Sequence, residues 1–167
     1  MKVNTISQKH IISFSECNYF GHLKLQACLK LFENARFIVS EMADIQDFFI
    51  ELHRSKYSNV SLINNENEYF MMPVIENNIV CHNQVKTGEQ VKIHTWLEEP
   101  LGSYCTFHHY LTSCDEKKLF ISCQTKVVLL GEKSGLRKSL PSVLNERIIN
   151  FIKNLKSYNE IEVGDGI

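Results

Sequence analysis

The chain has 167 residues, of which 44% are hydrophobic and 22% are charged, and this is enough for one domain with a buried core. Its net charge of −1 excludes a broad electrostatic attraction to nucleic acid or to an anionic membrane. No apolar run is long enough for a transmembrane helix and the N-terminal stretch lacks a signal-peptide core, so we expect a cytoplasmic protein with neither nucleic acid nor membrane as a partner.

The first predicted element is a strand over residues 8–15, which leads into the stretch ECNYFGH at 16–22. A helix is predicted to begin near Leu25, because apolar residues then recur at helical spacing. The apolar stripe consists of Cys28, Phe32, Ala35, Val39 and Met42. A helix with such a stripe should pack against a sheet.

A second, short helical piece is predicted over 44–54, with Asp44 as its N-cap. Residues 55–67 are polar and rich in asparagine, and they are predicted as a strand or loop. The stretch 68–83 is predicted to be extended, with Pro73 marking a bend or a sheet edge.

Three further strands are predicted, separated by a turn and by a hairpin-like connection. Their ranges are 90–99, 103–113 and 118–130. A last helix is predicted to open at 139–142, and the tail over 157–167 is predicted to be frayed. This order of elements predicts an α+β fold in which one long helix lies on an antiparallel sheet, with residues 1–167 as a single domain.

The six cysteines are predicted to be reduced and mostly buried, because none forms a C-x-x-C pair and several lie in apolar stretches. A zinc site would need close Cys and His pairs, and the nearest approach is Cys105 with His108 and His109. Adjacent strand residues face opposite sides, so His108 and His109 do not share a metal easily. We therefore expect no metal and no cofactor.

The stretch F-S-E-C-N-Y-F-G-H-L at 14–23, followed by LFENAR at 31–36, resembles the hotdog-fold acyl thioesterases of the 4-hydroxybenzoyl-CoA thioesterase type. In that family the first strand ends in a D-x-D-x-x-G-H-like loop and the central helix carries an F-E-x-x-R element. Later segments such as MMPV at 71–74 are also similar, and the resemblance covers about residues 5–148. It implies a curled antiparallel sheet around the long helix, a homodimer or homotetramer with active sites between subunits, and thioesters of coenzyme A or of an acyl carrier protein as substrates.

The catalytic carboxylate of that family is usually the second acid of D-x-D, where this chain has Asn18, while Glu16 stands at the first position. The pattern E-x-N-x-x-G is more similar to thioesterases of enediyne and related polyketide pathways, in which an asparagine and a helix arginine act. Asn18 and Arg36 match these two positions, so the resemblance implies that they are catalytic.

Thioester hydrolysis needs hydrogen-bond donors aimed at the carbonyl oxygen, which gains negative charge as it is attacked. The free N–H groups at the helix start, around Leu23 to Gln26 and including Leu25, would supply such donors. Gly21 would allow close approach of the backbone to a ligand, or it serves a tight turn alone.

Each of the other candidate residues has two interpretations. Asn18 donates to the oxyanion, or it caps the loop as an Asx-turn. Glu16, at an extended strand end and facing the same way as Asn18, activates water, or it is a solvated charge. His22 is a base or donor, or it only begins the helix. Arg36 donates to the substrate, or it pairs with Glu33 on its own helix.

Tyr19 and Phe32 are among the aromatic residues that would line an acyl tunnel, although an ordinary core explains most of these aromatics equally well. The compact basic stretch KSGLRK at 133–138 would suit the phosphates of coenzyme A, or it is a solvated loop. The family resemblance thus implies hydrolysis of an acyl-CoA or acyl-carrier-protein thioester, with release of a polyketide or fatty acyl chain. The alternatives are a hotdog protein that binds acyl thioesters without hydrolysing them, and a hotdog dehydratase, whose motif of a placed histidine with an acid is absent.

Overall fold

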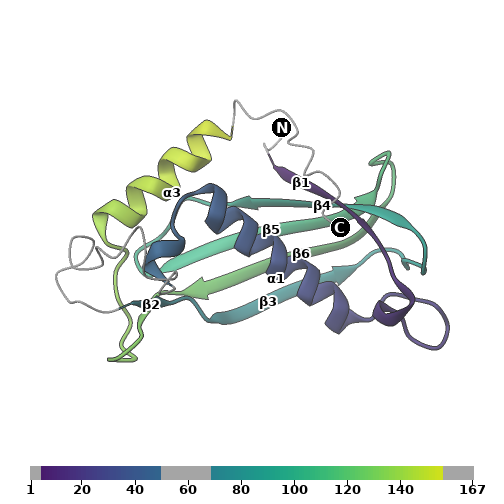
Figure 1. Cartoon of the computed structure of the whole chain (residues 1–167), viewed down its shortest axis with the longest axis horizontal. Coiled ribbons are helices and arrows are strands. Elements are labelled where there is room, and N and C mark those ends of the chain that lie inside the picture. The colour runs from purple at the N-terminus through teal and green to yellow at the C-terminus, as the bar shows by residue number, and fades with distance from the viewer. Residues whose placement is uncertain (1–4, 50–68, 156–167) are drawn as a thin grey trace, which may run out of the picture.

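A five-stranded antiparallel sheet and one long helix make up most of the molecule (Figure 1). The computed structural model describes residues 5–49 and 69–155. The sheet has the strand order β1-β4-β5-β6-β3, and the strands are β1 Ile6–Ile11, β3 Val74–Cys81, β4 Gln90–Leu97, β5 Tyr104–Ser113 and β6 Leu119–Val128. The helix α1, Leu25–Met42, lies across one face of this sheet, which confirms the predicted α+β hotdog fold.

Smaller elements complete the fold. The short strands β2, Phe70–Met71, and β7, Leu130–Gly131, pair with each other, and helix α3, Ser142–Asn154, follows them. Two 3-10 helices lie at Phe14–Glu16 (η1) and Gln46–Phe48 (η2). Within the described ranges, neither α-helix combines the length and the apolar character that crossing a bilayer would need.

The helix α1 begins at Leu25, as predicted, and its buried stripe is the predicted one apart from Met42, which is only partly buried. Its C-terminus differs from the prediction. Asp44 has a φ of 54°, its N–H donates to Glu41 O at 3.0 Å, and the N–H of Ile45 donates to Ser40 O at 3.1 Å. This is a Schellman ending, so the prediction that Asp44 caps a following helix is wrong. Only the 3-10 helix η2 follows within the described part of that segment, and the predicted strand or loop over 55–67 lies outside the described residues.

Strand β1 ends at Ile11, four residues before the predicted end at residue 15. The reason is a pair of hydrogen bonds from Ser13 to the Glu16 carboxylate, which closes the 3-10 helix η1. Ser13 N–H donates to Glu16 Oε2 at 2.7 Å, and the Ser13 hydroxyl lies 2.9 Å from the same oxygen. A Ser and a Glu three residues apart satisfy the backbone locally and compete with strand extension.

The predicted strands after residue 90 are confirmed, and their alternation sets the two faces of the sheet. Thr95, His109 and Cys123 stand opposite one another in register on β4, β5 and β6, and all three are buried on the face that α1 covers. Strand β3 is different, because it pairs only with β6 and most of its residues are exposed. It is an edge strand of the sheet, as β1 is at the other side, and most of it is open to solvent.

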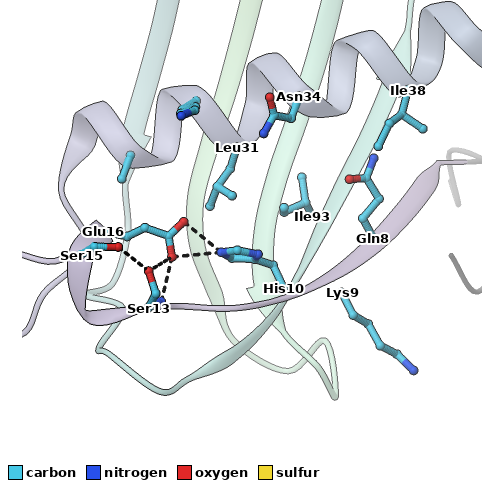
Figure 2. A pocket seen from close by; sticks show the side chains of 12 residues that line it. Gln8, Lys9, His10, Ser13, Ser15, Glu16, Leu31, Asn34, Ile38 and Ile93 are labelled. Atoms are coloured by element: carbon cyan, nitrogen blue, oxygen red, sulfur yellow. Dashed lines mark hydrogen bonds and ion pairs between the residues drawn. The ribbon is translucent and has the colours of Figure 1, made fainter. Parts of the chain in front are cut away.

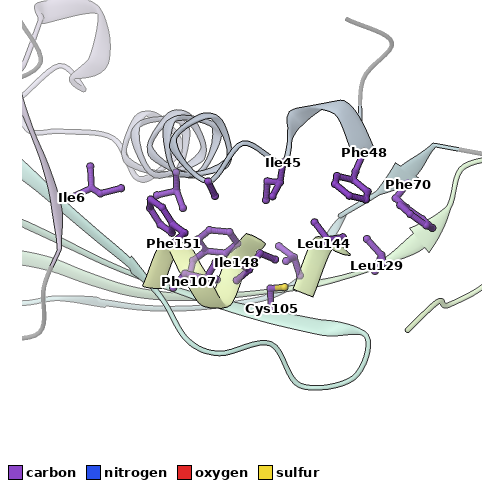
Figure 3. Close-up of a cluster of buried hydrophobic side chains, with 14 of the residues drawn as sticks. Ile6, Ile45, Phe48, Phe70, Cys105, Phe107, Leu129, Leu144, Ile148 and Phe151 are labelled. Atoms are coloured by element: carbon purple, nitrogen blue, oxygen red, sulfur yellow. The ribbon is translucent and has the colours of Figure 1, made fainter. Parts of the chain in front are cut away.

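A large apolar cluster joins the C-terminal half of α1, the 3-10 helix η2, helix α3 and the sheet (Figure 3). Phe48, Phe107 and Ile148 from three of these elements are each at most 5% exposed.

Two cysteine thiols, Cys28 and Cys105, are buried in the protein interior, and burial raises the pKa of each to about 12. Neutral, enclosed thiols cannot serve as nucleophiles at ordinary pH.

His109 is a polar group in this interior. It is fully buried, its ring stacks on Phe32 at a centroid distance of 4.8 Å, and its Nδ1 lies 2.9 Å from Thr95 Oγ1. Burial lowers the pKa of His109 to about 3, and the positive charges of Arg36 and His108 add to this effect. The imidazole is therefore neutral in the folded protein at ordinary pH.

We expect His109 to make folding sensitive to acid. Between about pH 6.5 and about pH 3 the unfolded chain binds a proton on this imidazole that the folded chain does not bind, so the free energy of unfolding should fall as the pH falls through this window. In urea denaturation measured across this range, His109→Gln should lose less stability per pH unit than the wild type. The exposed His82, replaced as His82→Gln, is the control and should leave the acid dependence unchanged. Equal slopes for His109→Gln and the wild type would contradict the assignment.

Candidate active site

The stretch ECNYFGH forms a tight hairpin loop at the end of the molecule where α1 begins (Figure 1). The Gly21 N–H donates to Asn18 O at 2.9 Å, and the Asn18 N–H donates to His22 O at 2.8 Å. Gly21 has a φ of 75°, a conformation that costs an L-residue about 1 kcal/mol or more. A Cβ there would lie 3.8 Å from Thr87 Cγ2, an ordinary contact, so the turn conformation and not crowding requires glycine.

The side chain of Asn18 holds this loop together. Its Oδ1 accepts hydrogen bonds from the backbone N–H groups of Phe20 at 3.0 Å and His22 at 3.1 Å. Since two donors meet at this position, the oxygen must lie there and the Nδ2 group must point away. Nδ2 makes no hydrogen bond to any residue that the structure describes. The two interpretations of Asn18 are therefore compatible, because the oxygen forms the Asx-turn while the nitrogen is a fixed donor.

The backbone N–H groups that are free at the start of α1 lie slightly later in the sequence than predicted. The N–H groups of Leu23 and Lys24 donate to Val85 O and Glu16 O, both at 2.9 Å. The Cys28 N–H makes the first bond into the helix, to Lys24 O. The N–H groups of residues 25–27 are thus the ones left without a backbone acceptor in the described structure, and they carry the positive end of the helix dipole.

Glu16 differs most from its predicted environment. It lies in the 3-10 helix η1 and not at an extended strand end, so its carboxylate is turned toward β1 (Figure 2). Both carboxylate oxygens lie close to His10 Nε2, at 3.0 and 3.1 Å, and Ser13 adds two hydrogen bonds. Partial burial acts to raise the pKa of Glu16, but the bonds from Ser13 and His10 outweigh it and hold that pKa below its ordinary value. Glu16 is therefore an ionised carboxylate with a hydrogen-bond contact at each oxygen.

A groove of about 490 Å³ lies between β1 with η1 on one side and α1 on the other (Figure 2). The residues that line it are Gln8, Lys9, His10, Ser13, Ser15, Glu16, Ala27, Lys30, Leu31, Asn34, Ile38 and Ile93. The groove brings Glu16 together with His10, but Asn18, His22 and Arg36 are not among its lining residues.

Two groove residues, Gln8 and His10, were not predicted as site residues. They alternate with Ile6 on the inner face of β1, where Ile6 is buried and Gln8 pairs with Ile93 of β4. The Nε2 atom of Gln8 is buried without a hydrogen-bond partner in the described structure. The sequence does contain an indication of this, because the period-two pattern of ISQKHI places two polar side chains on a face that begins with a core residue.

Arg36 lies on the other flank of α1. Positions two residues apart on an α-helix are about 200° apart around its axis, so Arg36 points away from the groove that Asn34 lines. It stands eleven residues after Leu25, which is about 16 Å along the helix. The loop of Asn18 lies at the N-terminal end of the same helix (Figure 1), so one protomer does not bring Asn18 and Arg36 to the same atom.

The guanidinium of Arg36 is half-buried and electrostatically coupled to His109 and Cys123 of the sheet. Burial lowers the pKa of Arg36, and Glu33 acts in the opposite direction without forming an ion pair. Among the described residues, no side chain forms a hydrogen bond or an ion pair with this guanidinium. The predicted pairing with Glu33 is therefore only a long-range attraction.

The predicted substrate-binding residues separate into two environments. Tyr19 occupies the tip of the loop and is fully exposed, and Leu25 is half-exposed at the helix start. Phe32 is fully buried between α1 and the sheet, where it stacks on His109. In the part of the chain that the structure describes, no group of three His, Cys, Asp or Glu side chains is arranged to hold a metal ion.

Comparison with known proteins agrees with this architecture. A sequence model described as the thioesterase-like superfamily matches residues 12–148. Among curated proteins, no sequence matches the chain.

Several solved structures share the fold. One is a 1,4-dihydroxy-2-naphthoyl-CoA thioesterase from Synechocystis, with a TM-score of 0.67 and 12% identity over 87% of this chain and 96% of that one. Another is a thioesterase superfamily protein from Jannaschia sp. CCS1, with a TM-score of 0.65 and 13% identity over 88% of this chain and 82% of that one. A third, the dynemicin thioesterase, whose structure was determined with a bound polyene, has a TM-score of 0.63 and 11% identity over 88% of this chain and 96% of that one.

The geometry of Asn18 leads to a prediction about stability. Asn18→Ala removes the acceptor for two loop N–H groups and should lower the free energy of unfolding by about 1 kcal/mol, with faster amide exchange at Phe20 and His22. Asn18→Asp keeps a side-chain oxygen at the same position and should retain both the stability and the slow exchange. Equal protection of the two amides in Asn18→Ala and the wild type would show that the side chain does not hold the loop.

Proposed function

The chain belongs to the thioesterase-like superfamily, and on this basis we propose that it hydrolyses the thioester of an acyl chain carried by coenzyme A or by an acyl carrier protein. The observation that carries the proposal is the fixed direction of the Asn18 amide. Its oxygen is engaged by two N–H groups of the loop, so Nδ2 is a donor held in place before any substrate arrives. A donor that needs no rearrangement stabilises a developing oxyanion most effectively.

The N-terminus of α1 supplies a second group of donors near this loop. Its first N–H groups, at residues 25–27, have no backbone acceptor in the described part of the chain, and the helix dipole favours negative charge there. Gly21 allows the loop to close tightly before the helix, and Leu25 and Tyr19 offer apolar surface beside it. Together these features suit the binding of a thioester carbonyl.

Arg36 has a different role in this proposal. Because it lies about 16 Å further along α1, we assign it to a polar group of the acyl chain, such as a keto group or a carboxylate, and not to the thioester of the same protomer. Its half-buried guanidinium, which has no hydrogen-bond partner among the described residues, supports such a role. A polyketide or oxidised fatty acyl chain has polar groups at this distance from the thioester.

We also propose that the protein acts as a homodimer or homotetramer. The edge strand β3 supports this, because it has one neighbouring strand and exposes apolar side chains such as Val74, Ile75 and Val80. A second copy would continue the sheet at this edge. It would bring its own α1 and its own Asn18 loop near those of the first protomer. His22 remains a candidate donor or base in the assembled site.

Replacement of Asn18 should separate the donor role from the loop role. Asn18→Asp should keep the fold but lower turnover by about ten-fold or more, because a donor is replaced by a negative charge beside the oxyanion. Free-thiol release from a panel of acyl-CoA and acyl-carrier-protein thioesters measures this, with wild type and Asn18→Ala assayed in parallel. Faster hydrolysis by Asn18→Asp would contradict the donor role and would mark the loop as a site for a carboxylate.

Replacement of Arg36 should depend on the acyl chain. Arg36→Gln should lower kcat/KM by about ten-fold or more for a chain with a distal keto or carboxylate group, and by much less for a saturated chain of equal length. Lys117→Gln, which removes an exposed positive charge from the turn between β5 and β6, is the control and should affect neither substrate. The same loss for both substrates would mean that Arg36 supports the fold and not the recognition of the chain.

One structural observation favours a second function. A histidine placed beside an acid is what a hotdog dehydratase requires, and His10 with Glu16 forms such a pair although the family motif is absent. A 3-hydroxyacyl thioester distinguishes the two reactions, since hydrolysis releases a free thiol whereas dehydration yields an enoyl thioester and no thiol. If acyl thioesters with a range of chains yield neither product but bind to the protein saturably, the protein is an acyl-thioester-binding protein without hydrolytic activity.

A further inference from the structure

The inner face of β1 has the wrong polarity for a strand in contact with the core. Ile6 is buried in the core, yet the next two residues on the same face, Gln8 and His10, are polar and point toward α1 (Figure 2). Across the groove, α1 presents Leu31 and Ile38. Polar residues at positions where packing favours apolar ones mark a functional site more often than a stability device.

The Glu16 carboxylate fixes the tautomer of the neutral His10 side chain. An ionised carboxylate can only accept hydrogen bonds, so the Nε2 atom that lies 3.0 and 3.1 Å from the two oxygens of Glu16 must carry the proton. The other ring nitrogen, Nδ1, then has a lone pair, and it makes no hydrogen bond within the described residues. A carboxylate that orients an imidazole in this way is the arrangement of a general base.

Glu16 is itself fixed. Ser13 donates to it through its backbone N–H at 2.7 Å, and the Ser13 hydroxyl lies 2.9 Å from the same oxygen. The carboxylate thus has little freedom to attack or to take a proton, while the imidazole that it holds remains about one-third exposed. The imidazole, and not the carboxylate, is the group available to a substrate.

We propose that the thioester is cleaved at the end of this groove that Glu16 and Ala27 line, beside the N–H groups of the helix start, with His10 as the general base and Glu16 as its positioning residue. This inference rests on the proposed function and supplies the base that Asn18 cannot provide. The apolar side of the groove, formed by Leu31, Ile38 and Ile93, binds the first part of the acyl chain, and only the distal polar group assigned to Arg36 lies outside the groove. The buried Nε2 of Gln8, which has no partner among the described residues, donates to a carbonyl oxygen of that chain.

The reaction balances without a further reactant. His10 Nδ1 takes a proton from water while the water oxygen bonds to the thioester carbonyl carbon, and the carbonyl electron pair moves onto its oxygen. When this tetrahedral intermediate collapses, the C–S bond breaks with its electron pair on sulfur, and the proton on Nδ1 passes to that sulfur. The products are a carboxylic acid and a free thiol.

The pH dependence should report this imidazole. The charged groups around it are Glu16 on η1, Lys30 on α1 and Lys9 on its own strand. Hydrolysis requires the ring without its second proton, so kcat should rise with pH along one limb and then level off. Glu16→Gln removes the carboxylate that orients the ring, so the plateau of kcat should fall while KM stays nearly unchanged.

The test is the pH profile of kcat and KM for free-thiol release, measured on wild type, His10→Gln, Glu16→Gln and the control His82→Gln. We expect kcat to fall about 100-fold or more in His10→Gln with KM nearly unchanged, a lower plateau of kcat at unchanged KM in Glu16→Gln, and wild-type behaviour in His82→Gln. Thermal unfolding of each variant separates loss of the base from loss of the fold.

Two results would overturn the proposal, and they differ in what else they reject. A wild-type enzyme that hydrolyses thioesters, with His10→Gln folded and equally active, would reject the base and leave the proposed function standing. A wild-type protein that releases no thiol from any acyl-CoA or acyl-carrier-protein thioester would reject the proposed function and, with it, the role of His10. An enoyl product from a 3-hydroxyacyl thioester without thiol release would also reject both, since the base would then remove a proton from carbon and not from water.

Discussion

Burial of one face of α1 against the sheet determines where every other side chain of the candidate site lies. Once Cys28, Phe32 and Ala35 are packed inward, the remaining circumference of the helix is divided into two flanks. One flank faces β1 and forms the groove with Glu16 and His10, and the other carries Arg36 toward the sheet near Cys123. Arg36 then lies about 16 Å along the helix axis from Leu25, where the helix begins after the Asn18 loop. A substrate that touches both must be long, as an acyl chain on a carrier is.

Charge is distributed unequally over these two flanks. On the β1 flank, a carboxylate is stabilised by four hydrogen bonds and stays ionised. On the other flank, a guanidinium lies near a buried, neutral imidazole and has no partner among the described residues. Both arrangements lower the free energy of unfolding relative to apolar side chains packed at the same positions, because charged groups lose hydration when they are partly buried. A ligand that is negative or rich in carbonyl oxygens near Arg36 would compensate for the second arrangement.

Most of the fold could be predicted from the sequence, because the spacing of apolar residues identifies each element and the order of the elements along the chain identifies the fold. The stripe from Cys28 to Val39 gave the helix and its inward face, and the alternation from Val91 to Leu97 gave a central strand. The prediction failed where a local hydrogen bond decided the outcome. Ser13 and Glu16 close a 3-10 turn that ends β1 early, and this moved the carboxylate away from Asn18 and toward His10. Asn18 was identified from its motif, but the direction of its amide depends on two backbone N–H groups that only the folded loop brings together. His10 was overlooked because nothing in the sequence places it beside Glu16.

The most direct measurement is a single turnover in ¹⁸O-labelled water with protein in excess over an acyl thioester, followed by mass spectrometry of the acid product and of the peptide that contains Glu16. Attack by water that a base has activated predicts one ¹⁸O atom in the released acid, one free thiol for each acid, and no label in Glu16. An unlabelled acid together with ¹⁸O in Glu16 would contradict this mechanism, because the carboxylate would then have attacked the thioester itself. Absence of both thiol and acid would contradict the assignment of the protein as a thioester hydrolase.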